Sequence, residues 1–222
     1  MSKPSVLVTG FEPYGGRGVN PAAEVTRQLN GSRIAGAEVI GRVLPVSYNG
    51  LRERVRDLVQ TIRPAAAVCL GLWPGEPMIR LEQVGINLAE FEIPDNEGLM
   101  LTGTPVHGPG VPARFATLPL RAIQRRLLEA GIPARLSSTA GTFLCNAAMY
   151  AALEALDEMG TGARGGFVHL PYLPQQVALL VAETQETQQL ELGQRADVAS
   201  MALDSMVAAL RIVIETTVLP RA

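Results

Sequence analysis

The stretch Ser137–Tyr150 reads SSTAGTFLCNAAMY. It starts as an extended segment, bends at Gly141 and continues as a helix, for which Thr142 is the expected N-cap. Cys145 then lies in the first helical turn, where free backbone N–H groups and the positive end of the helix dipole stabilise a thiolate. A buried structural cysteine would fit the same position. The rest of the chain has to decide between these two interpretations.

The composition is that of an ordinary globular protein: 222 residues, 47% apolar and 18% charged. We expect a single domain over residues 1–222. The formal charge of −2 and the lack of a basic cluster argue against nucleic-acid binding. Two cysteines, Cys69 and Cys145, do not make a disulfide framework, and the histidines, His107 and His169, lack zinc-site spacing, so we expect no metal. The apolar run in the first residues, MSKPSVLVTG, is too short for a signal peptide, and no segment is long and apolar enough to span a membrane. We therefore expect a cytoplasmic protein.

Strand-like and helix-like segments alternate along the chain, which indicates an α/β fold with helices on both faces of a sheet. The expected strands are Ser5–Gly10, Val39–Val46, Ala66–Leu72, Ala134–Ser138 and a short run ending at His169, with Ile79–Leu88 as a further strand or hairpin arm. The expected helices start at Pro21 behind an Asn20 cap, span Leu51–Ile62 and Leu118–Ala130, follow Thr142, and run over 196–217. Ligands of such sheets lie beyond the carboxyl ends of the strands, where Phe11, Leu72 and His169 fall.

A cysteine nucleophile needs a base and an acceptor that orients the base. His169 ends a strand and is the better candidate base, because His107 lies in a loop rich in proline and glycine. The acceptor stays open at this point among several acidic residues: Glu82, Glu90, Glu92, Asp95 and Glu97.

Other motifs are weaker. The segment GGRGVNP follows a strand and precedes a helix, but Pro21 stands where a dinucleotide fingerprint has its third glycine. A G-x-S-x-G nucleophile elbow does not occur. The aromatic loop from Phe11 to Tyr14 either walls a site for a small planar group or packs as part of the core.

Several segments together resemble the pyroglutamyl peptidase I family of cysteine peptidases. They are VTGFEPYGG with Asn20 and Pro21, EQVGIN, IPDNEG, STAGTFLCN with Tyr150, and GGFVHLPYLPQQ, and they span Val8–Gln176. The resemblance implies a three-layer α/β/α sandwich with a mostly parallel, mixed sheet. It also implies a hydrolase, a thiol peptidase that removes an N-terminal pyroglutamyl residue from peptides without a cofactor. Family members commonly assemble as dimers or tetramers.

The resemblance also assigns site residues. By position, Cys145 is the nucleophile, His169 the base and Glu82 the orienting acceptor. The pocket for the pyroglutamyl ring consists of Phe11, Tyr14, Asn20, Leu72, Ile93, Phe143 and Leu144. A flat, neutral lactam suits aromatic walls and a few hydrogen bonds better than a charged partner.

This chain departs from the family pattern at two positions. Glu76 and Glu92 stand where many members have arginine, and a carboxylate close to a thiol raises its pKa. Two alternatives to a peptidase therefore remain open. One is a non-catalytic relative that binds lactam ligands, and the other is a nucleotide-binding protein that uses the loop 15–18.

Overall fold

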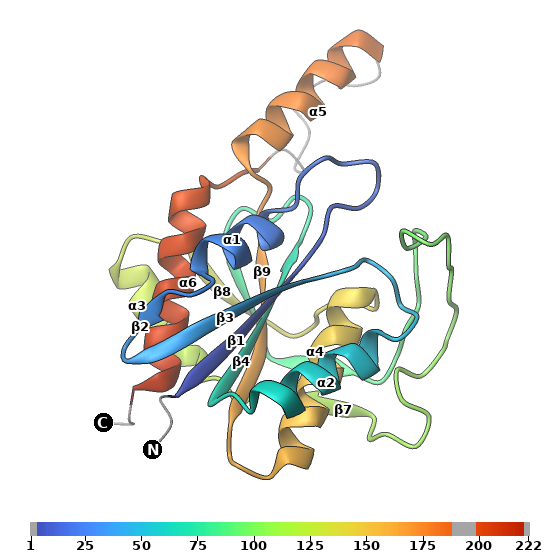
Figure 1. Cartoon of the computed structure of the whole chain (residues 1–222). Helices are drawn as coiled ribbons and strands as arrows, with labels where there is room; N and C mark the ends of the chain where they lie inside the picture. The colour runs from blue at the N-terminus through green and yellow to red at the C-terminus, as the bar shows by residue number, and fades with distance from the viewer. Residues whose placement is uncertain (1–3, 188–198, 220–222) are drawn as a thin grey trace.

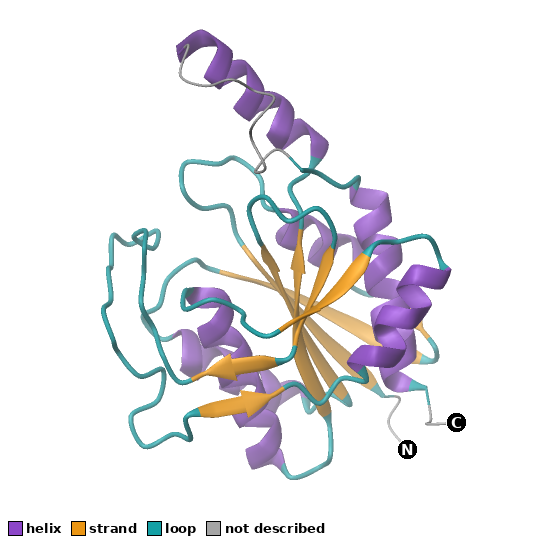
Figure 2. Cartoon of the chain, turned by 180° about the vertical axis from the view of Figure 1, so that it is seen from behind, coloured by secondary structure: helices purple, strands orange, loops and turns teal. Residues whose placement is uncertain are grey.

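The computed structural model describes residues 4–187 and 199–219. Within these ranges seven strands form one sheet in the order β2-β3-β1-β4-β9-β5-β8, and β6 pairs with β7 in a small separate sheet (Figures 1 and 2). The strands are β1 (Ser5–Phe11), β2 (Arg33–Ile34), β3 (Ala37–Leu44), β4 (Ala66–Leu72), β5 (Ile79–Glu82), β6 (Val84–Ile86), β7 (Ala113–Phe115), β8 (Ala134–Ser137) and β9 (Arg164–Leu170). The helices are α1 (Pro21–Leu29), α2 (Leu51–Ile62), α3 (Leu120–Glu129), α4 (Leu144–Met159), α5 (Pro174–Thr187) and α6 (Leu203–Val218).

The sheet is mixed, as expected. β3, β1, β4 and β9 run parallel to one another, β5 is antiparallel to β9, and β8 is parallel to β5. Helices α1, α3 and α6 cover one face of the sheet, and α2 and α4 cover the other (Figure 1). The α/β fold with helices on both faces is therefore confirmed. The carboxyl ends of the four parallel strands meet at one edge of the sheet, where ligands of such folds bind.

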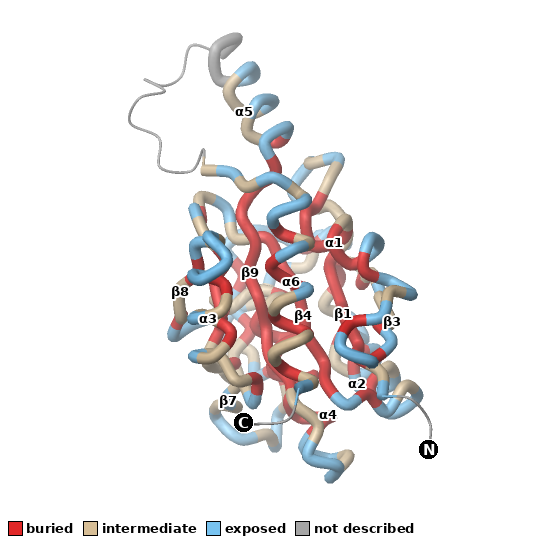
Figure 3. Tube along the Cα trace, turned by 90° about the vertical axis from the view of Figure 1, so that its left-hand side faces the viewer, coloured by how far each residue is buried: buried red, intermediate tan, exposed pale blue. Residues whose placement is uncertain are grey.

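The centre of the sheet is buried on both faces. All seven residues of β4 are buried, which explains the uninterrupted apolar sequence AAVCLGL. Figure 3 shows the buried strands at the centre of the molecule, while α5 extends beyond its body. Among the described residues, no helix combines the length and the apolar character that crossing a bilayer requires.

Most of the predicted boundaries are close to the observed ones. The bounds of α2 and β4 agree with the prediction, and the Asn20 cap of α1 is confirmed, since Oδ1 accepts from the N–H of Ala22 at 3.0 Å. α3 starts two residues later than predicted, at Leu120, because the residue before Pro119 is disfavoured in a helical conformation. α6 starts at Leu203 and not at residue 196, and residues 196–198 lie outside the described part of the chain.

Candidate active site

Cys145 lies in the first turn of α4, directly against the sheet. A Cβ atom added to Gly71, on β4, would be only 2.6 Å from its Sγ atom. The helix can therefore approach the strand this closely only because Gly71 has no side chain. The bend before the helix uses Gly141, whose φ of +77° is the left-handed conformation that glycine adopts without strain.

Thr142 is not the N-cap, and that prediction was wrong. The cap position is Phe143, which has no side chain able to accept a hydrogen bond. The hydroxyl of Thr142 instead donates to the carbonyl of Glu90 at 2.6 Å and ties the helix start to the loop after β6. The N–H groups of the first turn are thus left without a side-chain cap, which keeps them open to a ligand or an oxyanion.

His169 and Glu82 form a buried pair beside this thiol. The Nδ1–H of His169 donates to Oε1 of Glu82 at 2.8 Å, and both side chains are at most 1% exposed. His169 on β9 is in register with Gly71 on the neighbouring parallel strand β4, so both positions face α4. The imidazole therefore lies next to the position that Cys145 covers, with its Nε2 atom not engaged by Glu82. The second carboxylate oxygen of Glu82 has no hydrogen-bond partner among the described residues.

The electrostatics favour a neutral thiol and a neutral imidazole at rest. Burial raises the pKa of Cys145 to about 12, and Glu82 contributes a smaller effect in the same direction. Cys145 nevertheless keeps some exposed surface. The backbone N–H of Cys145 lowers this pKa, but burial outweighs it, so the predicted thiolate stabilisation at the helix start is overcome. Burial lowers the pKa of His169, against the opposing effect of Glu82. A neutral imidazole is the form that can accept a proton.

Six of the seven predicted pocket residues line a small cavity beside Cys145. The lining consists of Phe11, Tyr14, Asn20, Val46, Leu72, Phe143, Leu144 and Cys145. The cavity measures about 20 Å³, which is room for one water molecule and too little for a five-membered ring. Substrate binding therefore requires movement of the lining. The glycine-rich loop 13–18, which carries Tyr14, joins β1 to α1 and holds two glycines with positive φ.

Aromatic rings form one wall of this cavity. Tyr14 and Phe143 have their ring centroids 6.2 Å apart, and Phe91 meets Phe143 edge-on at 4.7 Å. Neither Val46 nor Phe91 was predicted as a pocket residue. Val46 follows the end of β3 and could have been found from that position, whereas Phe91 lies in an irregular segment with no local signal.

Two of the predicted pocket residues differ from expectation. Ile93 does not line the cavity and is 43% exposed, because Asp95 fixes its loop through three hydrogen bonds from the backbone N–H groups of Tyr48, Glu97 and Leu99. Asn20 does line the cavity, but Oδ1 caps α1 and Nδ2 donates to the carbonyl of Glu12 at 3.0 Å. Only the second N–H of this amide remains for a ligand.

The two acidic residues that replace the arginines common in the family, Glu76 and Glu92, lie in different surroundings. Glu76 is buried, and Arg135 donates to both of its carboxylate oxygens, at 3.0 and 2.6 Å, so its charge is paired. Glu92 is exposed. The carboxylate that most raises the pKa of Cys145 is Glu82, which belongs to the site itself.

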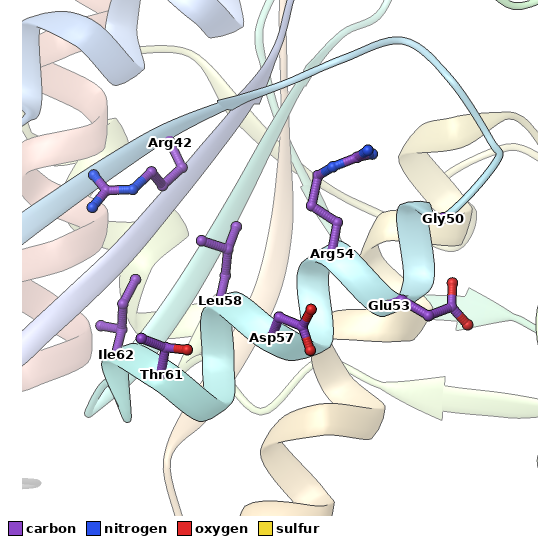
Figure 4. A pocket seen from close by; sticks show the side chains of 8 residues that line it. All are labelled: Arg42, Gly50, Glu53, Arg54, Asp57, Leu58, Thr61 and Ile62. Atoms are coloured by element: carbon purple, nitrogen blue, oxygen red, sulfur yellow. The ribbon is translucent and has the colours of Figure 1, made fainter.

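His107 and the larger hollow of the molecule both lie apart from the predicted site residues. His107 lies in its predicted loop, and its Nδ1 atom is 2.7 Å from Oε1 of Glu154. Glu154 lies in the C-terminal half of α4, whereas Cys145 lies in its first turn. A larger hollow of about 440 Å³ lies along α2, where Arg42 of β3 and Arg54 border it (Figure 4). None of the predicted site residues lines that hollow. Within the described ranges, no three His, Cys, Asp or Glu side chains are grouped so that they could hold a metal ion.

Comparisons with known proteins agree with one another. A family model described as pyroglutamyl peptidase matches residues 4–219. A pyrrolidone-carboxylate peptidase 1 from Ralstonia nicotianae is 41% identical over 96% of this chain and 93% of its own, and a pyrrolidone-carboxylate peptidase from Pyrococcus furiosus is 42% identical over 78% and 83%. Among solved structures, a mutant pyrrolidone carboxyl peptidase from P. furiosus has a TM-score of 0.88 at 35% identity and covers 96% of this chain and 97% of its own. The pyrrolidone carboxyl peptidase from Thermococcus litoralis has a TM-score of 0.87 at 33% identity, with 96% and 93% covered.

Proposed function

Because this chain belongs to the pyroglutamyl peptidase family, we propose that it hydrolyses the amide bond after an N-terminal pyroglutamyl residue of peptides. The products are free pyroglutamate and the shortened peptide. The observation that carries the proposal is the buried Glu82–His169 pair in register with the glycine that Cys145 covers. A nucleophile, a base and an orienting acceptor thus converge at the carboxyl edge of the sheet.

The reaction starts from the neutral pair. The Nε2 atom of His169 takes the proton from Cys145 as Sγ forms a bond to the carbonyl carbon of the pyroglutamyl residue. Glu82 stabilises the imidazolium that results. The carbonyl oxygen becomes an oxyanion, which the uncapped N–H groups at the start of α4 are suited to hold.

The intermediate then collapses. The C–N bond breaks, His169 gives its proton to the departing amine, and a thioester remains on Cys145. A water molecule replaces the amine, His169 accepts its proton, and hydroxide attacks the thioester. Cleavage of the C–S bond releases pyroglutamate, and the proton returns to the thiol. Because the resting pKa of Cys145 is raised, proton transfer to His169 is coupled to the attack and does not precede it.

We propose that the pyroglutamyl ring binds between Tyr14 and Phe143 once loop 13–18 moves outward. Phe11, Leu72 and Leu144 supply apolar surface, and the free N–H of Asn20 is a donor for the lactam carbonyl. Ile93 joins this pocket only if its loop closes over the bound ring. A flat ring without charge matches such a lining, since aromatic faces bind planar groups well.

Three further proposals follow from the family resemblance. The chain acts as one domain in the cytoplasm, and it assembles as a homodimer or homotetramer. Light scattering of the purified protein measures the subunit number.

The activity is tested with two fluorogenic amides, one of pyroglutamate and one of proline. The proline compound lacks the lactam carbonyl and carries a charged ring amine. We expect turnover of the pyroglutamyl amide alone, and none by a folded Cys145→Ala variant. Equal turnover by Cys145→Ala, or no turnover of either compound by the folded, reduced protein, would refute the proposal. The non-catalytic alternative predicts binding without turnover, and the peptidase relatives do not favour it.

A further inference from the structure

Arg80 contacts the same carboxylate oxygen as His169. It lies on β5 two residues before Glu82, so both side chains point to one face of the sheet. Its Nε–H donates to Oε1 of Glu82 at 2.6 Å, and Oε1 also accepts from Nδ1 of His169 at 2.8 Å. Oε1 is therefore held between a guanidinium and an imidazole. With its side chain only 6% exposed, Arg80 is an internal partner of the site and not a surface charge.

Two further acceptors fix the orientation of this guanidinium. Its Nε–H also lies 2.9 Å from Oγ of Ser137 on β8, and one Nη2–H donates to the carbonyl of Thr139 at 2.6 Å. Thr139 belongs to the segment that leads into the Cys145 turn. Arg80 consequently links β5, which carries Glu82, to the segment that precedes Cys145.

Trp73 connects Arg80 to His169 by a second route. The guanidinium carbon lies 3.6 Å from the centroid of the indole ring, a close cation–π contact. The same indole meets the imidazole edge-on, with the centroids 4.9 Å apart. Arg80 and His169 are also directly opposite in the antiparallel register of β5 and β9. The imidazole is thus supported through Glu82 on one side and through Trp73 on another.

Glu76 and Arg135 extend the network toward solvent. Oε2 of Glu76 lies 3.6 Å from Nη1 of Arg80, and both Glu76 oxygens accept from Arg135, which is 44% exposed. From the surface inward, positive and negative side chains alternate in the order Arg135, Glu76, Arg80 and Glu82. A buried arginine needs such anionic partners, and this arrangement accounts for an acidic residue at position 76.

We propose that Arg80 is a positioning residue, which holds Glu82 and Trp73 against His169. The proposal rests on the proposed function in that it takes His169 as the base. The charged and titratable groups that face His169 come from two elements and one loop: Cys145 of α4, Glu82 and Arg80 of β5, and Glu76 of the β4–β5 loop. Burial lowers the pKa of His169, Glu82 raises it, Arg80 lowers it and Glu76 raises it.

These signs predict opposite effects for two variants. Arg80→Met removes a cation, so protonation of His169 becomes easier and the acid limb of kcat/KM moves to higher pH. Glu76→Gln removes an anion and moves the same limb to lower pH. General damage to the fold does not produce shifts of opposite sign, so the pair distinguishes positioning from a merely structural role.

The experiment compares pH profiles of four variants with that of the unmodified chain. For Arg80→Met we expect kcat to fall on the order of 10²-fold, with KM changed only a few-fold, because Glu82 loses its fixed orientation. Arg80→Lys keeps the charge but not the fork of donors, so it restores the acid limb and only part of kcat. Arg126→Met is the matched control, since this arginine pairs with Glu215 between α3 and α6, and its profile should match that of the unmodified chain.

The proposal is overturned if folded Arg80→Met keeps the original kcat and acid limb. If Arg80→Met does not fold, Glu76→Gln decides: a shift to lower pH supports the proposal, and no shift, or a shift to higher pH, overturns it. Circular dichroism and a thermal melt establish folding in each case.

Alkylation of Cys145 by iodoacetamide separates this proposal from the proposed function, since it needs no substrate. The midpoint of its pH dependence should move upward in Arg80→Met, because loss of a cation makes proton loss from the site harder. If the chain hydrolyses no pyroglutamyl amide but this midpoint moves, the positioning role stands and the proposed function fails. If hydrolysis occurs while the midpoint and the acid limb both stay in place, the positioning role fails and the proposed function stands.

Discussion

Replacement of Gly71 by alanine tests how closely Cys145, the proposed nucleophile, must approach the sheet. The added Cβ would lie 2.6 Å from Sγ of Cys145 and 2.9 Å from Cζ of Phe167. Non-bonded heavy atoms are normally about 3.5–4.0 Å apart, so the thiol or the strand has to move by about 1 Å. Because Phe167 lies on another side of the same space, rotation of the thiol alone does not make room.

A displacement of that size at a reacting atom is expected to lower kcat/KM on the order of 10²-fold. Overpacking should also lower the free energy of unfolding by about 1–3 kcal/mol. Turnover of the pyroglutamyl amide and urea unfolding measure the two effects. Gly108→Ala is the matched control, because a Cβ there meets no atom within 4 Å and the residue has no positive φ. Folded Gly71→Ala with an unchanged kcat/KM would show that Cys145 is not held where the structure places it.

Three further predictions concern individual side chains. Glu82→Gln removes the anion that raises the pKa of His169, so the acid limb of kcat/KM should move to lower pH. The value of kcat should also fall on the order of 10²–10⁴-fold. An unchanged pH profile would argue against the pairing of Glu82 with His169. Asn20→Ala removes the cap of α1 and should cost about 1 kcal/mol in urea unfolding, whereas Asn20→Asp keeps the capping oxygen and should recover most of it. Cys69 is buried, whereas Cys145 keeps some exposed surface, so iodoacetamide should reach and modify Cys145 well before Cys69 in the native protein. The reverse order, seen by mass spectrometry, would contradict this assignment.

The elements that carry the site were predictable because their signals are local. The apolar run of β4, the proline after the Asn20 cap and the periodicity of α2 each specify a strand or helix without reference to distant residues. Strand ends then identify Phe11, Leu72 and His169 as neighbours, since parallel strands share one carboxyl edge. The choice of Glu82 as the acceptor was not local and came from the family resemblance.

What failed depended on tertiary contacts. Thr142 has the side chain of a good N-cap, but the carbonyl of Glu90 from a distant loop takes its hydroxyl. Burial of Cys145 raises its pKa against the local effect of the helix start. Ile93 stays outside the cavity, and its loop is held by the bond that Asp95 accepts from the backbone N–H of the distant Tyr48. Each outcome depends on a partner remote in sequence, which no window of the chain reveals.

The central claim is that Cys145 becomes acylated by the pyroglutamyl group. An activated pyroglutamyl ester, for which acylation outruns deacylation, can be mixed with the protein and quenched in acid during turnover. Intact-mass and peptide analysis should then show the mass of one pyroglutamyl group on the peptide that contains Cys145, and no such adduct in folded Cys145→Ala. Turnover without a covalent adduct, or an adduct on Cys69 instead, would contradict the account.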